Sequence, residues 1–513
     1  MGAARRKLRT PTAVVAGAIL ALGLLSLLAP STATYDPWAW IVWGREITEW
    51  DLSTVEGPSW KPLPVIVTTL AAPFGDAAPY VWIVAARMGA MAAVVLAFVL
   101  VRRLGGAAAG LIAAAAMGLA PWWIFNGWLA NSEGVLVAAV LGTVLAMADG
   151  RYRWALLWAL AAGLLRPEAW PFMLLLAAWI AWRGDHRDRV AVAVAVAVLP
   201  ITWLAPERWG SGDWLRAATR AQNPDPGAAS LTAFPAWTVT KDFVGMVPTA
   251  AWVAFGVALV GAVALRAGAS RGDAHPEPTT RAPGGGAVED ETTPVVDTAP
   301  AGDDRSTARA GLWAPSGSLS PRVRRRTTIG VALLGLAWLG VVLVMTERGF
   351  SGNERYLVPP AALLIVAFCA TAGAILVRVP VQARWIAFVA MVTGVAVAAA
   401  ADVPHQTDKV EYEARMVADL PRAIEAAGGA ERIKACAPVH THKLMVPQLA
   451  WRLRLHTSQI DYRPFGPYAV IFRTRITKDR QIHPVARDIP GIREIARTRR
   501  WIVEAACDPK GAR

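Results

Sequence analysis

Residues 11–29, PTAVVAGAILALGLLSLLA, form an apolar run between the basic stretch Arg5-Arg6-Lys7-Leu8-Arg9 and the outer sequence Tyr35-Asp36-Pro37-Trp38. A helix of about 20 apolar residues crosses a bilayer, and basic flanks favour the cytoplasmic side. The run therefore predicts a first span with a cytoplasmic N-terminus. A cleaved signal peptide is the alternative, since Ser31-Thr32-Ala33 resembles a cleavage site, but the length of the run favours an uncleaved anchor. Both interpretations place Asp36 outside the cell.

The rest of the chain has the composition of a multi-pass protein of the plasma membrane. It is 55% hydrophobic over 513 residues, and its net charge of +14 comes largely from Arg and Lys at the ends of apolar segments, which argues against a nucleic-acid partner. Spans are expected at residues 11–30, 78–101, 107–125, 133–149, 154–182, 189–205, 244–266, 328–346, 357–378 and 384–401.

The stretch 154–182 needs a separate interpretation because it is too long for one upright helix. Arg166-Pro167-Glu168 interrupts it, and basic residues flank it on both sides. If both flanks are cytoplasmic, it forms a hairpin of two short helices. The fold class that follows is an α-helical polytopic membrane protein with about eleven transmembrane helices and an extracytoplasmic C-terminus.

Three regions are predicted along the chain. Residues 1–402 form the transmembrane module, and residues 267–327 within it, rich in Gly, Pro, Thr, Asp and Arg, form a disordered cytoplasmic linker. Residues 403–513 form a small extracytoplasmic α/β domain. Its elements are expected as helices at 409–427 and 443–455 and strands at 432–438, 468–473 and 501–506. Outside the cytoplasm, Cys436 and Cys507 could form a disulfide.

The residues of the first outer loop could have structural roles instead of a chemical one. Asp36-Pro37 matches a helix N-cap followed by proline at the first helical position, so Asp36 could serve only as a cap. Trp40, Trp43, Ile47 and Trp50 share one helical stripe, which predicts a short helix lying in the membrane interface.

Charged residues gather near the outer ends of the spans. Arg87 lies within a span, at a cost of about 2.5–3.5 kcal/mol unless it snorkels or finds a partner. Arg166 and Arg355 on the outer face oppose the positive-inside bias and favour pairing with an anion, although Glu168 and Glu354 are alternative internal partners. A pump or transporter would favour charges at the midplane.

The order and placement of these residues resemble the GT-C superfamily of polytopic glycosyltransferases. The resemblance covers about residues 11–402. Its matching pieces are Asp36, Trp60-Lys61-Pro62-Leu63-Pro64, Phe74-Gly75 with Arg87, Arg102-Arg103-Leu104-Gly105-Gly106 and Glu354-Arg355-Tyr356-Leu357-Val358-Pro359. Lys61 departs from the His-Pro-Pro-Leu type of stretch that relatives often carry.

The resemblance implies an inverting transfer of a sugar from a polyprenyl-phosphate carrier to an acceptor hydroxyl on a glycan, lipid or protein at the outer face. Asp36 would be the catalytic base. The expected donor-phosphate ligands are Arg355, Lys61, Arg166 and Arg87, and the expected substrate-binding or orienting residues are Glu133, Glu168, Glu354, Tyr356 and Trp60.

Other functions remain open at this level. A divalent cation is possible because the outer loops carry many carboxylates, but no group of them has the sequence spacing typical of metal ligands. The alternatives to a transferase are a transporter or flippase of a lipid-linked sugar, and a membrane scaffold that acts through its exterior domain. A scaffold would tolerate substitution of the charged outer loops and not of residues 403–513.

Overall fold

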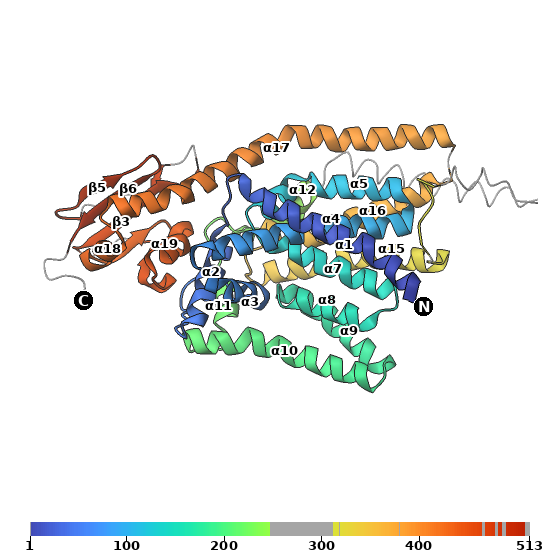
Figure 1. Ribbon diagram of the computed structural model, residues 1–513, viewed down its shortest axis with the longest axis horizontal. Helices are drawn as coiled ribbons and strands as arrows, with labels where there is room; N and C mark the ends of the chain where they lie inside the picture. The colour runs from blue at the N-terminus through green and yellow to red at the C-terminus, as the bar shows by residue number, and fades with distance from the viewer. Residues whose placement is uncertain are drawn as a thin grey trace, which may run out of the picture.

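The computed structural model describes residues 2–246, 311–317, 319–378, 380–463, 467–477, 481–484 and 489–507. Figure 1 shows a bundle of helices aligned along the long axis, with a small sheet-containing domain at one end. The chain is therefore an α-helical, multi-pass membrane protein with a C-terminal α/β unit, as the sequence predicted.

The helices follow the apolar segments of the sequence. They are α1 (Gly2–Leu25), α2 (Tyr35–Thr48), α3 (Pro62–Ala71), α4 (Ala78–Gly105), α5 (Ala107–Gly118), α6 (Pro121–Trp128), α7 (Glu133–Ala148), α8 (Tyr152–Gly163), α9 (Trp170–Arg183), α10 (His186–Ser211), α11 (Arg216–Ala221), α12 (Pro235–Met246), α15 (Pro321–Glu347), α16 (Val358–Leu376), α17 (Val381–Ala426), α18 (Ala430–Cys436) and α19 (Val446–Leu453).

Within the described ranges, five helical stretches are long and apolar enough to cross a membrane, or up to six if α5 and α6, bent by 63°, form one broken span. Two shorter apolar helices, at Thr12–Leu28 and Glu133–Ala148, add to these. The expected span at 244–266 lies outside the described residues from position 247 onward. The count of about eleven crossings therefore stays a prediction.

The predicted hairpin at 154–182 is confirmed as α8 and α9. Arg153 at the start of α8 pairs with Asp185 at 3.1 Å and Asp188 at 2.5 Å, just beyond the end of α9. The two ends therefore meet, and Arg166-Pro167 forms the turn at the opposite end. Proline interrupts the helix there because it cannot donate a backbone hydrogen bond and it restricts the residue before it.

Helices α4 and α16 approach closely near their C-terminal ends because glycines face each other. A Cβ atom added to Gly373 would lie 2.2 Å from the carbonyl oxygen of Gly105, and one added to Gly105 would lie 2.7 Å from that of Ala370. Small residues allow helix backbones in a membrane to pack at short distance. This contact holds the C-terminal end of α4 against α16, whose N-terminal end follows the loop with Arg355.

Part of the predicted linker is ordered. Residues 267–310 lie outside the described residues, but Trp313 is buried and forms edge-to-face contacts with Trp385 and Phe388 of α17. Helix α15 then begins at Pro321, with Ser320 as its N-cap. The linker prediction was therefore too long at its C-terminal end.

Helix α17 joins the bundle to the C-terminal domain without a break. It is one 46-residue helix that runs from the bundle into the domain along one side of the molecule (Figure 1). Its C-terminal half packs on the sheet, where Asp419 accepts hydrogen bonds from the Thr498 hydroxyl at 2.7 Å and the Arg500 backbone N–H at 3.0 Å. The sequence suggested a span ending at 401 and a separate helix from 409; the structure shows one continuous helix.

The C-terminal domain contains a six-stranded mixed sheet. Its strands are β1 (Val439–Thr441), β2 (Ile460–Asp461), β3 (Ala469–Arg475), β4 (Ile482–His483), β5 (Arg493–Arg497) and β6 (Trp501–Ala506). The order is β2-β1-β3-β6-β5, with β4 paired to β3, and only the β1–β2 and β1–β3 pairs are parallel. The predicted strand at 432–438 is wrong, because 430–436 form helix α18. The predicted disulfide between Cys436 and Cys507 is confirmed.

The Trp stripe of α2 is covered by protein, whereas the sequence predicted that it faces the membrane interface. Trp40 is 1% exposed and Trp43 0% exposed, packed on Trp82 and Trp60. Only Trp50 of the predicted stripe is largely exposed. Helix α2 packs between α3 and helix α19 of the C-terminal domain, so protein covers the surface that the periodicity assigned to lipid.

Candidate active site

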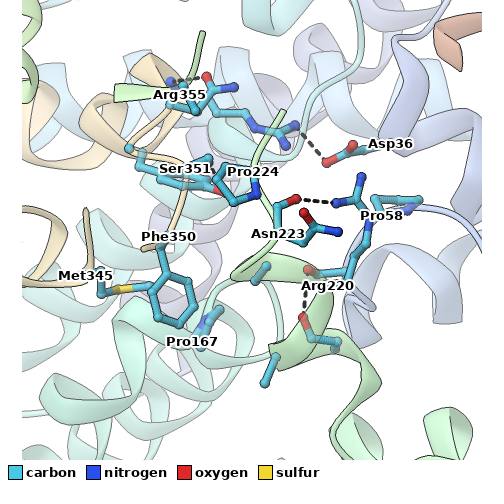
Figure 2. Close-up of a pocket in the computed structure, with 18 of the residues that line it drawn as sticks. Asp36, Pro58, Pro167, Arg220, Asn223, Pro224, Met345, Phe350, Ser351 and Arg355 are labelled. Atoms are coloured by element: carbon cyan, nitrogen blue, oxygen red, sulfur yellow. Dashed lines mark hydrogen bonds and ion pairs between the residues drawn. The ribbon is translucent and has the colours of Figure 1, made fainter. Parts of the chain in front are cut away.

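A cavity of about 890 Å³ lies where one end of the bundle meets the C-terminal domain. Its walls come from the start of α2, the loop before α3, the hairpin turn, the segment from α10 to α12, the loop after α15 and the start of the C-terminal domain. Figure 2 shows the Arg355 side chain reaching Asp36, with a dashed line between them, and Phe350, Met345 and Pro167 on another wall. Segments far apart in the sequence therefore converge on one polar site.

Asp36 is a buried carboxylate that faces this cavity and does not cap a helix. Helix α2 begins at Tyr35, its N-cap is Thr34, and no side chain caps it, so the interpretation of Asp36 as a helix cap is wrong. Oδ2 of Asp36 lies 2.7 Å from Nη1 of Arg355. Burial would raise its pKa, but the charges of Arg355, Lys61 and Arg166 outweigh burial and hold the pKa below its ordinary value.

Lys61 supplies a second cation to the same carboxylate. Its Nζ lies 3.9 Å from Oδ2 of Asp36 and 4.9 Å from the centre of the Trp40 ring, and this buried ammonium has no hydrogen-bond partner among the described residues. Burial, followed by repulsion from Arg166 and Arg355, lowers the pKa of Lys61 to about 7. An unpartnered nitrogen lining a cavity is suited to binding an anion.

Arg166 extends the charged group from the hairpin turn. It forms a close ion pair with the buried Glu133 at the start of α7, and its Nη1 lies 3.8 Å from Glu168. The guanidinium also lies 4.5 Å from the centre of the Tyr356 ring. The internal partners considered from sequence were Glu168 for Arg166 and Glu354 for Arg355. Glu168 does lie near Arg166, although Glu133, which was not considered as its partner, is closer. Among the described residues, Arg355 pairs with Asp36 instead of Glu354.

The remaining predicted site residues divide by position. Trp60 is buried, lines the cavity and donates its indole N–H to the carbonyl of Thr202 at 3.0 Å. Glu354 is exposed at the cavity wall. The hydroxyl of Tyr356 lies 3.3 Å from that of Ser351, so this ring is held beneath Arg166.

Arg87 belongs to a different environment and does not line the cavity. Its guanidinium donates to the carbonyl and hydroxyl of Ser26, at 3.0 and 2.8 Å, and to the carbonyl of Trp128, at 3.1 and 3.3 Å. It also stacks 4.2 Å from the Trp128 ring. The prediction that Arg87 binds the donor phosphate is therefore corrected: Arg87 ties α4 to the short helical turn Ser26–Leu28 and to the end of α6.

Sequence reasoning missed the cavity wall around α11. Arg216 donates to the carbonyls of Pro58 at 2.6 Å and Gly57 at 3.0 Å, which fixes the loop leading to Lys61. Arg220 lines the cavity and donates to Gly57 as well, at 3.2 Å. Both arginines lie in the predicted outer loop after the 189–205 span, so the positive-inside argument used for Arg166 and Arg355 could have identified them.

Tyr35 was also missed, although it precedes Asp36 directly. It lines the cavity, and burial, reinforced by the Asp36 charge, raises its pKa above the ordinary value. Its hydroxyl therefore stays protonated and can donate a hydrogen bond. Within the described part of the chain, no three His, Cys, Asp or Glu side chains are placed to hold a metal ion.

The arrangement combines an ionised carboxylate with cationic side chains in a largely buried site. The carboxylate can accept a proton from a hydroxyl. Lys61, Arg166 and Arg355 can stabilise negative charge on a phosphate, and their contribution is larger in a partly dry cavity than in water.

The chain resembles known proteins only in comparisons with solved structures. No family model matches the chain, and a search of curated proteins found no match. The chain is similar to the crystal structure of ArnT from Cupriavidus metallidurans bound to undecaprenyl phosphate, at 14% identity over 96% of this chain and 97% of that chain, with a TM-score of 0.44. It is also similar to the apo state of the same ArnT, at 14% identity over 97% and 98% of the two chains, with a TM-score of 0.42.

Proposed function

We propose that this protein is an inverting glycosyltransferase that moves a sugar from a polyprenyl-phosphate carrier to an acceptor hydroxyl at the outer face of the membrane. The observation that carries the proposal is the buried Asp36 carboxylate at 2.7 Å from Arg355 and 3.9 Å from Lys61 in a cavity at the outer ends of the helices. The GT-C-like order of the same residues in the sequence supports it.

The reaction needs one base and one anion site. The acceptor oxygen attacks the anomeric carbon while the bond from that carbon to the phosphate oxygen breaks, and a single displacement inverts the configuration. Asp36 accepts the hydroxyl proton, and the polyprenyl phosphate leaves with the electron pair. Arg355 and Lys61, with Arg166 behind them, stabilise the charge that grows on the phosphate.

The Asp36–Arg355 ion pair sets the order of events. While the pair is intact, the pKa of Asp36 is low and the carboxylate is a weak base. A phosphate that attracts Arg355 and Lys61 competes with Asp36 for their charge, so the carboxylate becomes more basic when the donor is bound. Acceptor deprotonation is thereby coupled to donor binding.

An apolar groove supports a donor that carries a long lipid tail. A cavity of about 630 Å³ lies between α7, α8, α9 and α15 and is lined mainly by apolar side chains, among them Leu176, Val331 and Trp338. Trp338 lies on α15 about two helical turns from Met345, which lines the polar cavity. A lipid chain in the groove would therefore place its phosphate end toward Arg355.

The disulfide supports an exterior location for the C-terminal domain. Disulfides persist outside the reducing cytoplasm, and the bond between Cys436 and Cys507 lies in the domain that borders the cavity. With this domain outside, the cavity opens at the outer face, and the charged ends of the hairpin, Arg153 and Asp185, lie on the cytoplasmic side.

The proposal is tested with purified protein in lipid nanodiscs and a panel of polyprenyl-phosphate sugars with a cell-envelope extract. Mass spectrometry follows donor consumption, free polyprenyl phosphate and glycosylated product. We expect one donor to yield free polyprenyl phosphate and a product of matching mass.

The same donors in proteoliposomes separate the transferase from a transporter. Movement of an intact donor across the bilayer, with no free polyprenyl phosphate from any donor, would replace the transferase with a flippase.

A further inference from the structure

The C-terminal domain contributes directly to the candidate active cavity. Lys443 and Leu444, from a short helical turn (Lys443–Met445) of this domain, line the cavity opposite the membrane module. Lys443 forms a close ion pair with Asp225 in the loop after α11, which lines the same cavity. This domain therefore forms part of the cavity wall.

The domain is fixed against the helix that carries Asp36. Arg45 of α2 donates to the carbonyl of Leu455 at 2.9 Å, and Glu46 of α2 lies 2.9 Å from Nδ1 of His456. Glu46 is 1% exposed, so this contact is well inside the interface. The surface beside the cavity is thus a preformed wall, and its chemistry bears on what enters.

An aromatic ring with cations around it continues the cavity on the domain. Tyr462 follows edge strand β2 and remains 40% exposed. The Arg463 guanidinium lies 5.2 Å and the Lys443 Nζ 5.8 Å from the centre of its ring. Leu444, on the cavity wall, is 41% exposed. Lys443 thus belongs both to the cavity wall and to the group around Tyr462.

These features match a sugar chain that carries acidic groups. The apolar face of a pyranose ring can pack on an exposed aromatic ring, and Tyr offers a rigid contact surface with a polar end. Carboxylate or phosphate groups on the chain can form charge-assisted hydrogen bonds with Arg463, and with Lys443 in place of Asp225. A neutral glycan would leave these cations unused.

We propose that Tyr462, Arg463 and Lys443 form an acceptor subsite for an acidic oligosaccharide, which extends from the cavity over the C-terminal domain. The subsite deepens the proposed function, on which its role as the acceptor side rests. The acceptor hydroxyl enters toward Asp36, and the chain beyond it lies on Tyr462.

Saturation-transfer-difference NMR on the full chain in neutral-lipid nanodiscs tests the subsite with trigalacturonic acid as the probe, and with maltotriose and triglutamate as comparisons. We expect saturation transfer to trigalacturonic acid, and about fivefold to tenfold weaker binding in Tyr462→Ala and in Arg463→Gln. Arg493→Gln is the matched control, because Arg493 is an exposed arginine on β5, the opposite edge of the same sheet. The control should bind as the wild type does.

Each contrary result removes a defined part of the proposal. If the neutral maltotriose binds as well as trigalacturonic acid, the subsite has no preference for acidic groups. If triglutamate binds as well as trigalacturonic acid, the subsite does not recognise a sugar. No binding of trigalacturonic acid, or unchanged binding in both subsite variants, would overturn the subsite. The experiment contains no donor, so its failure is separate from failure of the transfer assay.

Discussion

At the scale of the residue, Asp36 satisfies two requirements that usually conflict. Buried carboxylates tend to take up a proton, yet a general base must be ionised. The cations around Asp36 resolve the conflict, since their charges outweigh the effect of burial on its pKa. The same cations cannot be fully satisfied by one carboxylate, and the Nζ of Lys61 and the Nε of Arg355 have no hydrogen-bond partner among the described residues.

Lys61 gives the free protein a pH-dependent stability. Its pKa is lowered to about 7 by burial and by Arg166 and Arg355, with Asp36 and Glu133 opposing. Between about pH 7 and the ordinary lysine pKa, the unfolded chain binds a proton at Lys61 that the folded chain lacks, so this residue makes stability rise with pH. Lys61→Met should therefore raise the melting temperature at pH 7, and its advantage should shrink by pH 9.5. Parallel pH profiles for wild type and variant would contradict this assignment.

Variants of Arg87 and Arg355 should differ in their effects, because we expect Arg87 to support the structure and Arg355 to bind the donor. Arg87→Met leaves the carbonyls of Ser26 and Trp128 without their donor, so we expect a loss of about 1–3 kcal/mol of stability with donor binding retained. Arg355→Gln should instead abolish donor binding with a smaller change in melting temperature. Thermal melts and equilibrium binding of the donor check both. If the folded Arg87→Met variant no longer binds the donor, Arg87 is a ligand of the donor phosphate after all.

The sequence identified the charged residues that gather at the candidate site, but it did not predict their ion-pair partners. The sequence identified Asp36, Lys61, Arg166 and Arg355 as outer-face charges, because each lies near the end of an apolar run. It offered Glu168 and Glu354 as internal partners because neighbours in the sequence are the visible choices. The actual partners, Glu133 and Asp36, come from distant helices, and only tertiary packing brings them together.

At the scale of the element, hydrophobic periodicity predicted where the helices are, but it did not predict what covers their apolar faces. The Trp stripe of α2 indicates an apolar face, but lipid and protein produce the same pattern. The C-terminal domain covers α2, which a local pattern cannot show. The apolar part of α17 likewise gave no sign that the helix continues into the domain.

The close contact of α4 and α16 can be tested at the same scale. Gly373→Ala would place a Cβ atom 2.2 Å from the carbonyl oxygen of Gly105, so the helices must separate. We expect a loss of about 1–3 kcal/mol, seen as a lower melting temperature. Gly340→Ala in α15 is the control, since nothing lies within 4 Å of its Cβ position. Equal melting temperatures for the two variants would show that this contact is not tight.

At the scale of the whole molecule, the C-terminal domain and the bundle share one cavity. The disulfide closes a loop with a sequence separation of 71 residues, and removal of such a bond costs roughly 2–5 kcal/mol. Cys436→Ser with Cys507→Ser should therefore lower the melting temperature and, because the domain forms part of the cavity wall, reduce transfer as well. Thermal melts with transfer assays check this. Full transfer activity at an unchanged melting temperature would separate the domain from the site.

The most direct test of the central claim compares transfer rates for wild type, Asp36→Asn and Asp76→Asn at saturating donor. Asp36→Asn keeps the size of the side chain and removes its basicity, so the account predicts intact donor binding with transfer reduced by about 10²–10⁴-fold. Asp76 is a 92% exposed aspartate just before the start of α4, and its variant should behave as the wild type. Wild-type transfer by folded Asp36→Asn would contradict the account, because the base would then lie elsewhere.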